Sequence, residues 1–255
     1  MRRVNLLGLA TIAVALASWE VLVRSGALDF HFLPAPSGIF RGLTSLLSSG
    51  DLVPRVVHTL RSTLLGWALA SVIGAVVGIW LGLSDTAWRY SMASIELVRA
   101  VPPIALVPVA LLVFGFSLHM ELTIIVFAAA WTVLVNTIDG VRGVPAELLD
   151  VAHVLGMSKL TTIRKVIVPS AVASILVGLR LALSLSLVLA VVAEMLGNPR
   201  GLGNGLIRSQ QALQPEQMFA YVLAIGVLGI TLNAAVRYAS ARLFPGLARG
   251  SGDRS

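Results

Sequence analysis

The sequence predicts an all-α integral membrane protein with about six transmembrane helices. Of its 255 residues, 57% are hydrophobic and 12% are charged, and the mean hydropathy is +0.90. A soluble globular domain of this length carries far more charge. Apolar runs of about 20 residues, the length that crosses a bilayer as a helix, recur along the chain. The chain has no cysteine, which excludes disulfide frameworks and thiolate metal sites.

Six apolar runs are the candidate spans. No internal repeat or linker divides them, so we expect one transmembrane domain over residues 1–255, with an anchor helix at 6–23 and core spans over about 60–243. The third run is the weakest candidate, because its prolines remove hydrogen-bond donors and kink a helix. The runs are Leu6–Val23, Leu64–Leu83, Val101–Phe116, Leu122–Ile138, Ala171–Leu196 and Met218–Val236.

The first run has two interpretations. Arg2 and Arg3 precede it and Ala15-Leu16-Ala17 resembles a cleavage site, which is typical of a secretory signal peptide. However, the apolar run continues past that site, and it is longer than the 7 to 15 residues or so of a signal-peptide core. We therefore expect a retained anchor.

The net charge of +7 comes from cations at the ends of the apolar runs rather than from one basic face. This distribution favours anchoring at the membrane surface over nucleic-acid binding. With the N-terminus inside, twelve of the 19 Lys and Arg residues lie on the cytoplasmic side, six lie outside and Arg180 lies within a span. The bias predicts that both termini are cytoplasmic. On the outer side, residues 38–47 are predicted to form a short amphipathic helix.

Small residues recur at every fourth position of the second run: Gly66, Ala70, Gly74, Gly78 and Gly82. This spacing places nearly bare backbone along one side of a helix, where a second helix can approach closely. Glycine is also common in membrane helices generally, which is the alternative explanation. Five in register favour a packing seam, within the bundle or between subunits.

Three ionisable residues fall within the apolar runs, where such groups are costly and often functional. Glu20 lies near the outer end of its run, where placement at the membrane interface explains it. Arg180 and Glu194 are separated by about 21 Å along one helix, so they do not pair. Each either lines a pathway or bonds to neighbouring backbone.

Catalytic constellations are missing. All four histidines fall outside the predicted spans: His31, His58, His119 and His153. No histidine is therefore available for a Ser-His pair or a metal site within the membrane. Neither lysine belongs to a phosphate-binding loop, so the chain has no ATPase site of its own. We expect no catalytic residue and no metal.

The loop before the fifth run predicts a helix of about ten residues outside the membrane. Pro145 suits its start, Glu147 and Asp150 place negative charge in its first turns, and Gly156 suits its C-terminal cap. Its apolar residues recur at spacings of three and four and make one buried face. They are Leu148, Val151, Ala152 and Leu155. Such a face must dock on the membrane, on the bundle or on a partner.

This loop resembles the Glu-Ala-Ala loop of permease subunits in binding-protein-dependent ABC importers. The matching pattern is Asp150-Val151-Ala152, three residues, Gly156, nine residues, and Val166-Ile167-Val168-Pro169. Asp for Glu and Val for Ala are departures that preserve the charge and the apolar face. Further stretches resemble the nitrate, sulfonate and taurine branch of that family: Leu33–Ser37, Arg99–Pro108, Gly178–Leu183, Ala193–Gly197 and Gly201–Gly203.

The resemblance implies a type I ABC-importer permease-like bundle in the bacterial inner membrane, with a cytoplasmic coupling helix in residues 142–168. It implies import of a small solute such as a sulfonate, taurine or nitrate by alternating access. It also implies an ABC ATPase subunit, an external solute-binding protein and a second copy of the chain as partners. No cofactor is expected in this chain, because ATP and Mg²⁺ belong to the ATPase. The residues implied at the ATPase contact are Glu147, Asp150, Val151, Ala152, Gly156 and Pro169.

Two other functions are compatible with the hydropathy. An ion-coupled secondary transporter would favour inverted repeats and carboxylates at the midplane of the membrane. The sequence offers only Glu20 and Glu194, both near an outer end, and no repeat. A membrane anchor or scaffold would leave the loop helix unexplained.

Overall fold

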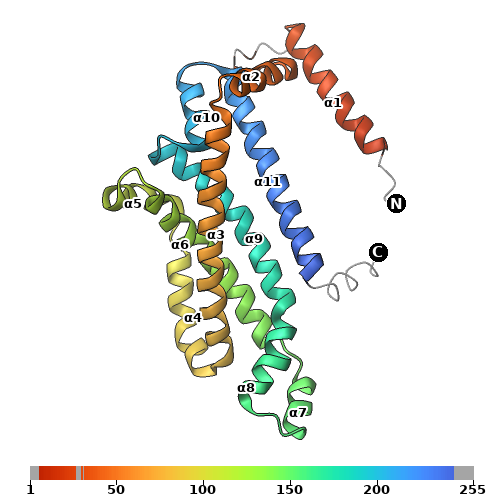
Figure 1. The fold of residues 1–255 in the computed structure, drawn as a ribbon, viewed down its shortest axis with the longest axis vertical. Helices are drawn as coiled ribbons and strands as arrows, with labels where there is room; N and C mark the ends of the chain where they lie inside the picture. The colour runs from red at the N-terminus through yellow and green to blue at the C-terminus, as the bar shows by residue number, and fades with distance from the viewer. Residues whose placement is uncertain (1–5, 27–29, 31, 244–255) are drawn as a thin grey trace.

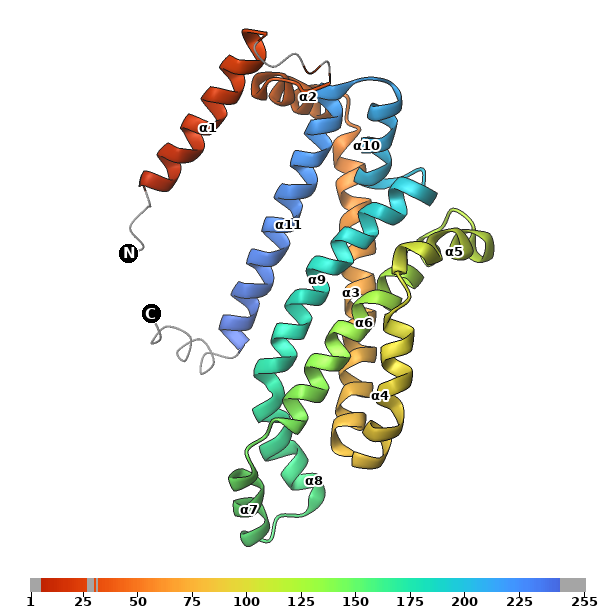
Figure 2. The ribbon, with the colours of Figure 1, turned by 180° about the vertical axis from the view of Figure 1, so that it is seen from behind.

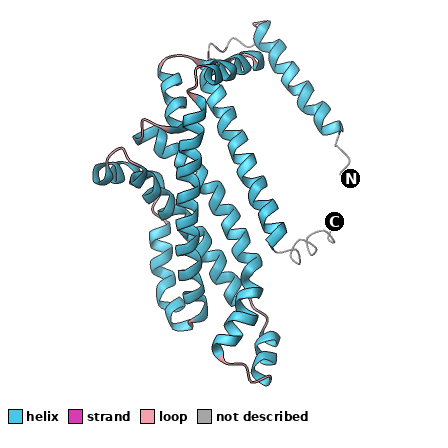
Figure 3. Ribbon diagram, in the orientation of Figure 1, coloured by secondary structure: helices cyan, strands magenta, loops and turns pink. Residues whose placement is uncertain are grey.

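The computed structural model describes residues 6–26, 30 and 32–243, and every regular element within them is a helix (Figures 1 and 3). The long elements are α1 (Leu6–Arg24), α3 (Leu52–Leu83), α6 (Leu118–Arg142), α9 (Val168–Gly197) and α11 (Pro215–Leu243). The shorter ones are α2 (Pro36–Ser48), α4 (Asp85–Arg99), η1 (Pro103–Leu106), α5 (Val107–Phe114), α7 (Ala146–Val154), α8 (Lys159–Thr162), η2 (Ile163–Ile167) and α10 (Gly201–Gln211).

Four helical runs among the described residues are long and apolar enough to cross a membrane: α3, α6, the continuous run from α8 through α9, and α11. A fifth span is formed if α4 and the η1–α5 segment count as one, since they pass the same test together but are bent by 73°. The predicted third span, Val101–Phe116, is therefore only one arm of a bent pair. Pro102 and Pro103 lie at the bend, where they end one helix and begin the next.

The core of the molecule is the contact of α6 with α3 on one side and α9 on the other. The seam of Gly66, Ala70, Gly74, Gly78 and Gly82 is buried, and its four glycines face α6. A Cβ built on Gly74 would stand 2.6 Å from the carbonyl oxygen of Ala130 and 2.8 Å from Cβ of Val133. The absence of side chains on this strip is what lets the two backbones approach so closely.

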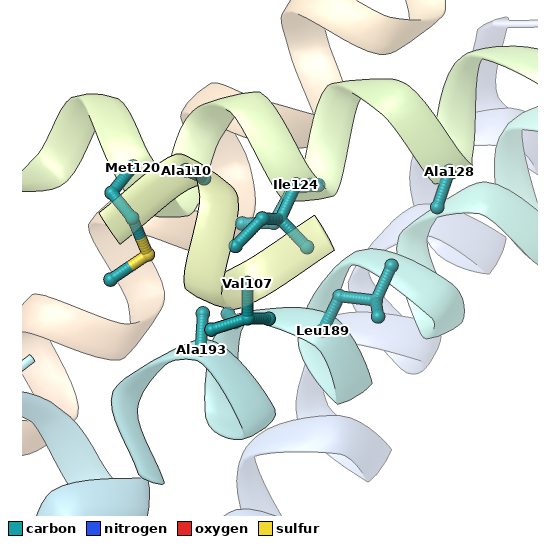
Figure 4. Close-up of a cluster of buried hydrophobic side chains, with 9 residues drawn as sticks. Val107, Ala110, Met120, Ile124, Ala128, Leu189 and Ala193 are labelled. Atoms are coloured by element: carbon teal, nitrogen blue, oxygen red, sulfur yellow. The ribbon is translucent and has the colours of Figure 1, made fainter. Parts of the chain in front are cut away.

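Around this core the bent arm α5 fills the space between α6 and α9. Val107 of α5 packs with Met120 of α6 and Ala193 of α9 in one buried apolar cluster (Figure 4). The helix stops at Gly115, whose φ of +63° is a backbone conformation that favours glycine. The next helix, α6, begins with Ser117 as its N-cap, the hydroxyl accepting from the backbone N–H of Met120.

Short helices lie at both ends of the bundle. Figures 1 and 2 show α7 and α8 at one end, which we call the inner end, and α2 and α10 at the other, which we call the outer end. Helix α1 stands apart from the bundle and meets it through α2. There the carboxylate of Glu20 accepts hydrogen bonds from the backbone N–H and the hydroxyl of Ser37, at 2.9 and 2.7 Å. A carboxylate at the first turn of α2 also complements that helix's dipole.

The sequence placed the start of the second span too late. Helix α3 begins at Leu52, twelve residues before Leu64, and α6 begins at Leu118, so His58 and His119 lie within long helices. These two histidines therefore lie in helices that are long enough to span the membrane and not in loops as expected, whereas His31 lies outside the described residues. Arg55, His58 and Arg61 lower the local hydropathy, but they do not stop a helix whose inward side is occupied by Thr59 and Ser62.

Candidate functional site

At the inner end, the short helix α7 connects two core helices. Only residues 143–145 separate it from α6, and residues 155–158 separate it from α8. From Lys159 to Gly197 the backbone stays helical, and residues 163–167 form a wider π turn that Pro169 follows by two residues. Helix α7 is thus joined to both α6 and α9 by short connections.

The C-terminal end of α7 is closed by Gly156. The N–H of Gly156 donates to the carbonyl of His153 at 2.9 Å, and the N–H of Met157 donates to that of Ala152 at 3.0 Å. Gly156 has a φ of +64°, so this end of the helix is a glycine cap of the expected kind. A Cβ at this position would meet nothing within 4 Å, so the demand for glycine comes from the backbone angle.

The apolar face of α7 is open within the single chain. Only Ala152 is buried, at 2% exposure, whereas Val151 is 56% and Leu155 is 65% exposed. The predicted buried face is thus realised at one residue and is otherwise available to a partner. Glu147, Asp150 and Pro169 are exposed as well.

At the outer end, Glu194 of α9 is fully buried and is bound by the start of α10. Its Oε2 accepts from the hydroxyl of Thr59 and from the backbone N–H of Gly203, both at 2.9 Å. The same hydroxyl of Thr59 accepts from the N–H of Leu202 at 2.9 Å. These N–H groups belong to the first turn of α10, where backbone donors have no partner within the helix and negative charge is favoured.

The Gly201-Leu202-Gly203 sequence makes this arrangement possible. Gly201 has a φ of +86°, and a Cβ there would overlap the carboxylate of Glu194. The backbone can therefore wrap around the carboxyl group only if this position is glycine.

Beside Glu194 lies a second buried carboxylate, Glu121 of α6, which the sequence analysis did not single out. Its Oε1 lies 3.0 Å from Nε2 of His58 on α3 and accepts from the side-chain amide of Asn198. The amide oxygen of Asn198 accepts in turn from the N–H of Arg200 at 3.1 Å, which fixes the orientation of the amide. Helices α3, α6 and α9 therefore meet in one polar cluster, which we call the outer polar cluster: His58, Thr59, Glu121, Glu194 and Asn198.

A cavity of about 500 Å³ opens beside this cluster. Its wall includes His58 and three arginines, Arg55, Arg61 and Arg200. Arg55 is paired with Asp51, with its Nε 2.7 Å from the carboxylate. The cavity is therefore predominantly cationic, and it lies at the outer end of α3.

Arg180 lies on α9 and is exposed on the surface of the single chain, far from the outer polar cluster. Glu194, by contrast, is 0% exposed. The two residues that the sequence singled out as pathway candidates thus occupy different environments, and the structure does not bring them together.

The overall arrangement is similar to that of solved ABC transporters. The chain matches the structure titled "Inward facing conformations of the MetNI methionine ABC transporter" with a TM-score of 0.62 and 18% identity, over 76% of this chain and 95% of that one. Similarity at this level of identity establishes the fold alone. It agrees with the type I permease-like bundle expected from the sequence.

Sequence comparison decides the family. Residues 70–249 match the family described as "Binding-protein-dependent transport system inner membrane component". The chain belongs to this family. The ion-coupled secondary transporter considered above is accordingly not favoured.

The similarity to named permeases extends over nearly the whole chain. The protein named as an aliphatic sulfonates transport permease, SsuC of Bacillus subtilis, is 33% identical over 92% of this chain and 86% of its own length. The bicarbonate transport system permease protein CmpB of Synechococcus elongatus is 31% identical over 91% of this chain and 87% of its own. This multi-pass membrane protein is therefore a permease subunit of an ATP-driven importer.

Proposed function

We propose that this permease carries a small anion, such as a sulfonate, nitrate or bicarbonate, or the zwitterionic sulfonate taurine, into the cytoplasm, and that two copies pair within the membrane. The named relatives above transport two such anions. The cationic cavity at the outer end, lined by Arg55, Arg61 and Arg200, would attract a solute of that charge. Exposed Arg180 would line the path between the two copies.

The driving force comes from a separate ATPase subunit that binds α7. ATP and Mg²⁺ belong to that subunit, and an external solute-binding protein delivers the anion at the outer end. The inner end of the bundle and both chain termini then face the cytoplasm of a bacterial cell, as the charge bias suggests.

The observation that carries this proposal is the exposed apolar face of α7 between α6 and α9. Among the described residues Leu148, Val151 and Leu155 remain 44%, 56% and 65% exposed, so a partner that buries them gains hydrophobic free energy. The ATPase contact comprises Glu147, Asp150, Val151, Ala152, Gly156 and Pro169. If ATP-bound and ATP-free partners hold α7 differently, they favour different arrangements of α6 and α9.

Replacing Gly156 by valine tests the coupling role. A β-branched residue at a φ of +64° costs about 1 to 2 kcal/mol, so the loop would shift and α7 would lose its position. We expect normal membrane insertion, reduced co-purification of the ATPase and loss of uptake driven by ATP. Gly156→Asn is the matched control, since asparagine tolerates this conformation.

Normal ATPase co-purification together with normal uptake in Gly156→Val would count against the docking role. The partners have a separate test, because genes for an ATPase and a secreted binding protein should lie beside the gene for this chain. The substrate class is tested by asking which anion the neighbouring binding protein retains.

A further inference from the structure

The outer polar cluster contains more buried negative charge than its hydrogen bonds account for. Glu121 and Glu194 are both 0% exposed. Oε2 of Glu121 and Oε1 of Glu194 are buried without any hydrogen-bond partner. An ionised carboxylate in an apolar interior is costly unless positive charge compensates it, and a half-satisfied one remains costly.

The only ionisable group in direct contact with either carboxylate, among the described residues, is the imidazole of His58. One imidazole supplies at most one positive charge, against two carboxylates. The nearby Arg55 pairs with Asp51, and no arginine in the described part of the chain forms an ion pair with either carboxylate. With His58 neutral, as a metal ligand must be, two ionised carboxylates are balanced by two units of positive charge, which is the charge of one divalent ion.

The geometry of the three groups suits a metal ion. A ring nitrogen of His58 and one oxygen each from Glu121 and Glu194 lie within 4.8 Å of one another. Zinc binds such ligands at about 2.0 to 2.2 Å, and two ligands at a tetrahedral angle are then about 3.3 Å apart. The 3.0 Å between Nε2 of His58 and Oε1 of Glu121 is close to that separation. The ligand oxygen of Glu194 would have to move closer to the other two ligand atoms by at most about 1.5 Å to reach the same separation.

We propose that His58, Glu121 and Glu194 bind a divalent transition-metal ion of the zinc type. One imidazole and two carboxylates are a mixed nitrogen and oxygen set that such ions accept, and a fourth position stays open to water. Neighbouring groups orient the two carboxylate ligands by hydrogen bonds. Asn198 donates to Glu121, and Thr59 and the backbone N–H of Gly203 donate to Glu194.

The ion would link three helices whose ligands lie 63 and 73 residues apart in the sequence, at positions 58, 121 and 194. A separate cavity of about 210 Å³, which Glu194 and Asn198 line together with no arginine or lysine, offers a cation a path to the site. The role of the ion is to hold the outer ends of α3, α6 and α9 together. This inference does not depend on which solute the permease carries.

Metal binding by the purified full-length chain tests the proposal. The chain carries an affinity tag without histidine, is stripped with a chelator and is then titrated with Co²⁺, whose visible absorption reports its coordination. Zn²⁺ bound per chain is measured separately by mass spectrometry. We expect one ion per chain and a higher thermal midpoint with metal, because the ion binds the folded state. Failure of the wild-type chain to bind either ion in stoichiometric amount overturns the proposal.

Three variants locate the site: His58→Ala, Glu121→Gln and Glu194→Gln. Each should weaken Co²⁺ binding by at least about tenfold and abolish the metal-dependent rise of the thermal midpoint. The matched control is His119→Ala, which removes a histidine from the exposed side of the same α6 helix and should leave both readouts unchanged. Binding that survives in His58→Ala, or that is lost in His119→Ala, overturns the assignment.

Discussion

Replacing Gly74 by alanine should force α3 and α6 apart. The added Cβ would stand 2.6 Å from the carbonyl oxygen of Ala130, 2.8 Å from Cβ of Val133 and 3.0 Å from the backbone N of Leu134. Two of these three atoms belong to the backbone of α6, which cannot rotate away as a flexible side chain can. Relief therefore requires the helices to separate, and separation weakens the contacts at Gly78 and Gly82 as well.

The magnitude follows from two opposing effects. Overpacking a close contact costs about 1 to 3 kcal/mol. Alanine in place of glycine within a helix stabilises the folded state by about 0.8 to 1 kcal/mol, because alanine has the higher helix propensity. Gly226→Ala in α11 is the matched control, because a Cβ there would meet nothing within 4 Å of the single chain. Both variants gain the same propensity, so the difference between their free energies of unfolding should be about 1 to 3 kcal/mol.

Thermal unfolding of the two variants in the same detergent measures this difference. At about 2 to 4 °C per kcal/mol for a chain of this size, Gly74→Ala should unfold about 2 to 12 °C below Gly226→Ala. Equal thermal midpoints would refute the conclusion that the seam is closed against α6.

Three further outcomes are expected. Thr59→Val leaves the N–H of Leu202 without its acceptor and should lower the free energy of unfolding, measured by thermal unfolding, by about 1 to 3 kcal/mol. The control Thr231→Val, on the exposed surface of α11, should change it by less than about 0.5 kcal/mol. Equal losses in the two variants would contradict this role for Thr59. Arg180→Leu should reduce anion uptake in vesicles while Arg180→Lys retains part of it, and full uptake with leucine would make Arg180 purely structural. Hydrogen bonds from Arg55 and Tyr221 lower the pKa of Asp51 from its usual 3.8, although burial acts in the opposite direction. Ionised Asp51 therefore stabilises the folded state fully above the unfolded pKa, and this stabilisation is lost as the pH falls through the lower folded pKa. Thermal midpoints between pH 6 and 3 should therefore fall less steeply in Asp51→Asn than in the wild type, and parallel slopes would contradict this.

Local patterns were enough to predict most of the helices. The amphipathic pattern after Pro36 predicts α2, and Pro145 and Gly156 bracket α7 within two residues of its ends. These features depend on helical periodicity and capping, which act over a few neighbouring residues. The strip of small residues on α3 is likewise visible in the sequence, although its partner helix is not.

Other elements escaped because they are not uniformly apolar. Helix α4 carries Asp85, Arg89, Glu96 and Arg99, so hydropathy gives no sign of it. It begins because Ser84 caps its first turn and ends shortly before Pro102. The early part of α3 was missed for the same reason, since its charged residues hide a helix whose inward face is small and polar.

The outer polar cluster was the hardest feature to predict, because its members come from three stretches of sequence that lie more than 60 residues apart. His58 alone resembles a surface histidine, and Glu121 sits at the edge of an apolar run. Only the packing of α3 against α6 and α9 brings them together. The one local signal was Gly201-Leu202-Gly203 following Glu194, a glycine pair that allows a helix N-terminus to approach a carboxylate.

The hydrogen bonds between α3, α6 and α9 are unevenly distributed along the bundle. Among the described residues, side-chain bonds that join these helices lie in the outer polar cluster and at Trp67, whose indole donates to the carbonyl of Leu179 at 2.8 Å. Toward α7 the same helices pack through small residues such as Gly140 and through buried apolar side chains such as Leu81 and Ile138. If these helices slide against one another near α7, no side-chain hydrogen bond between their described residues is broken. The fixed outer ends would consequently act as a pivot, about which the ends near α7 can swing.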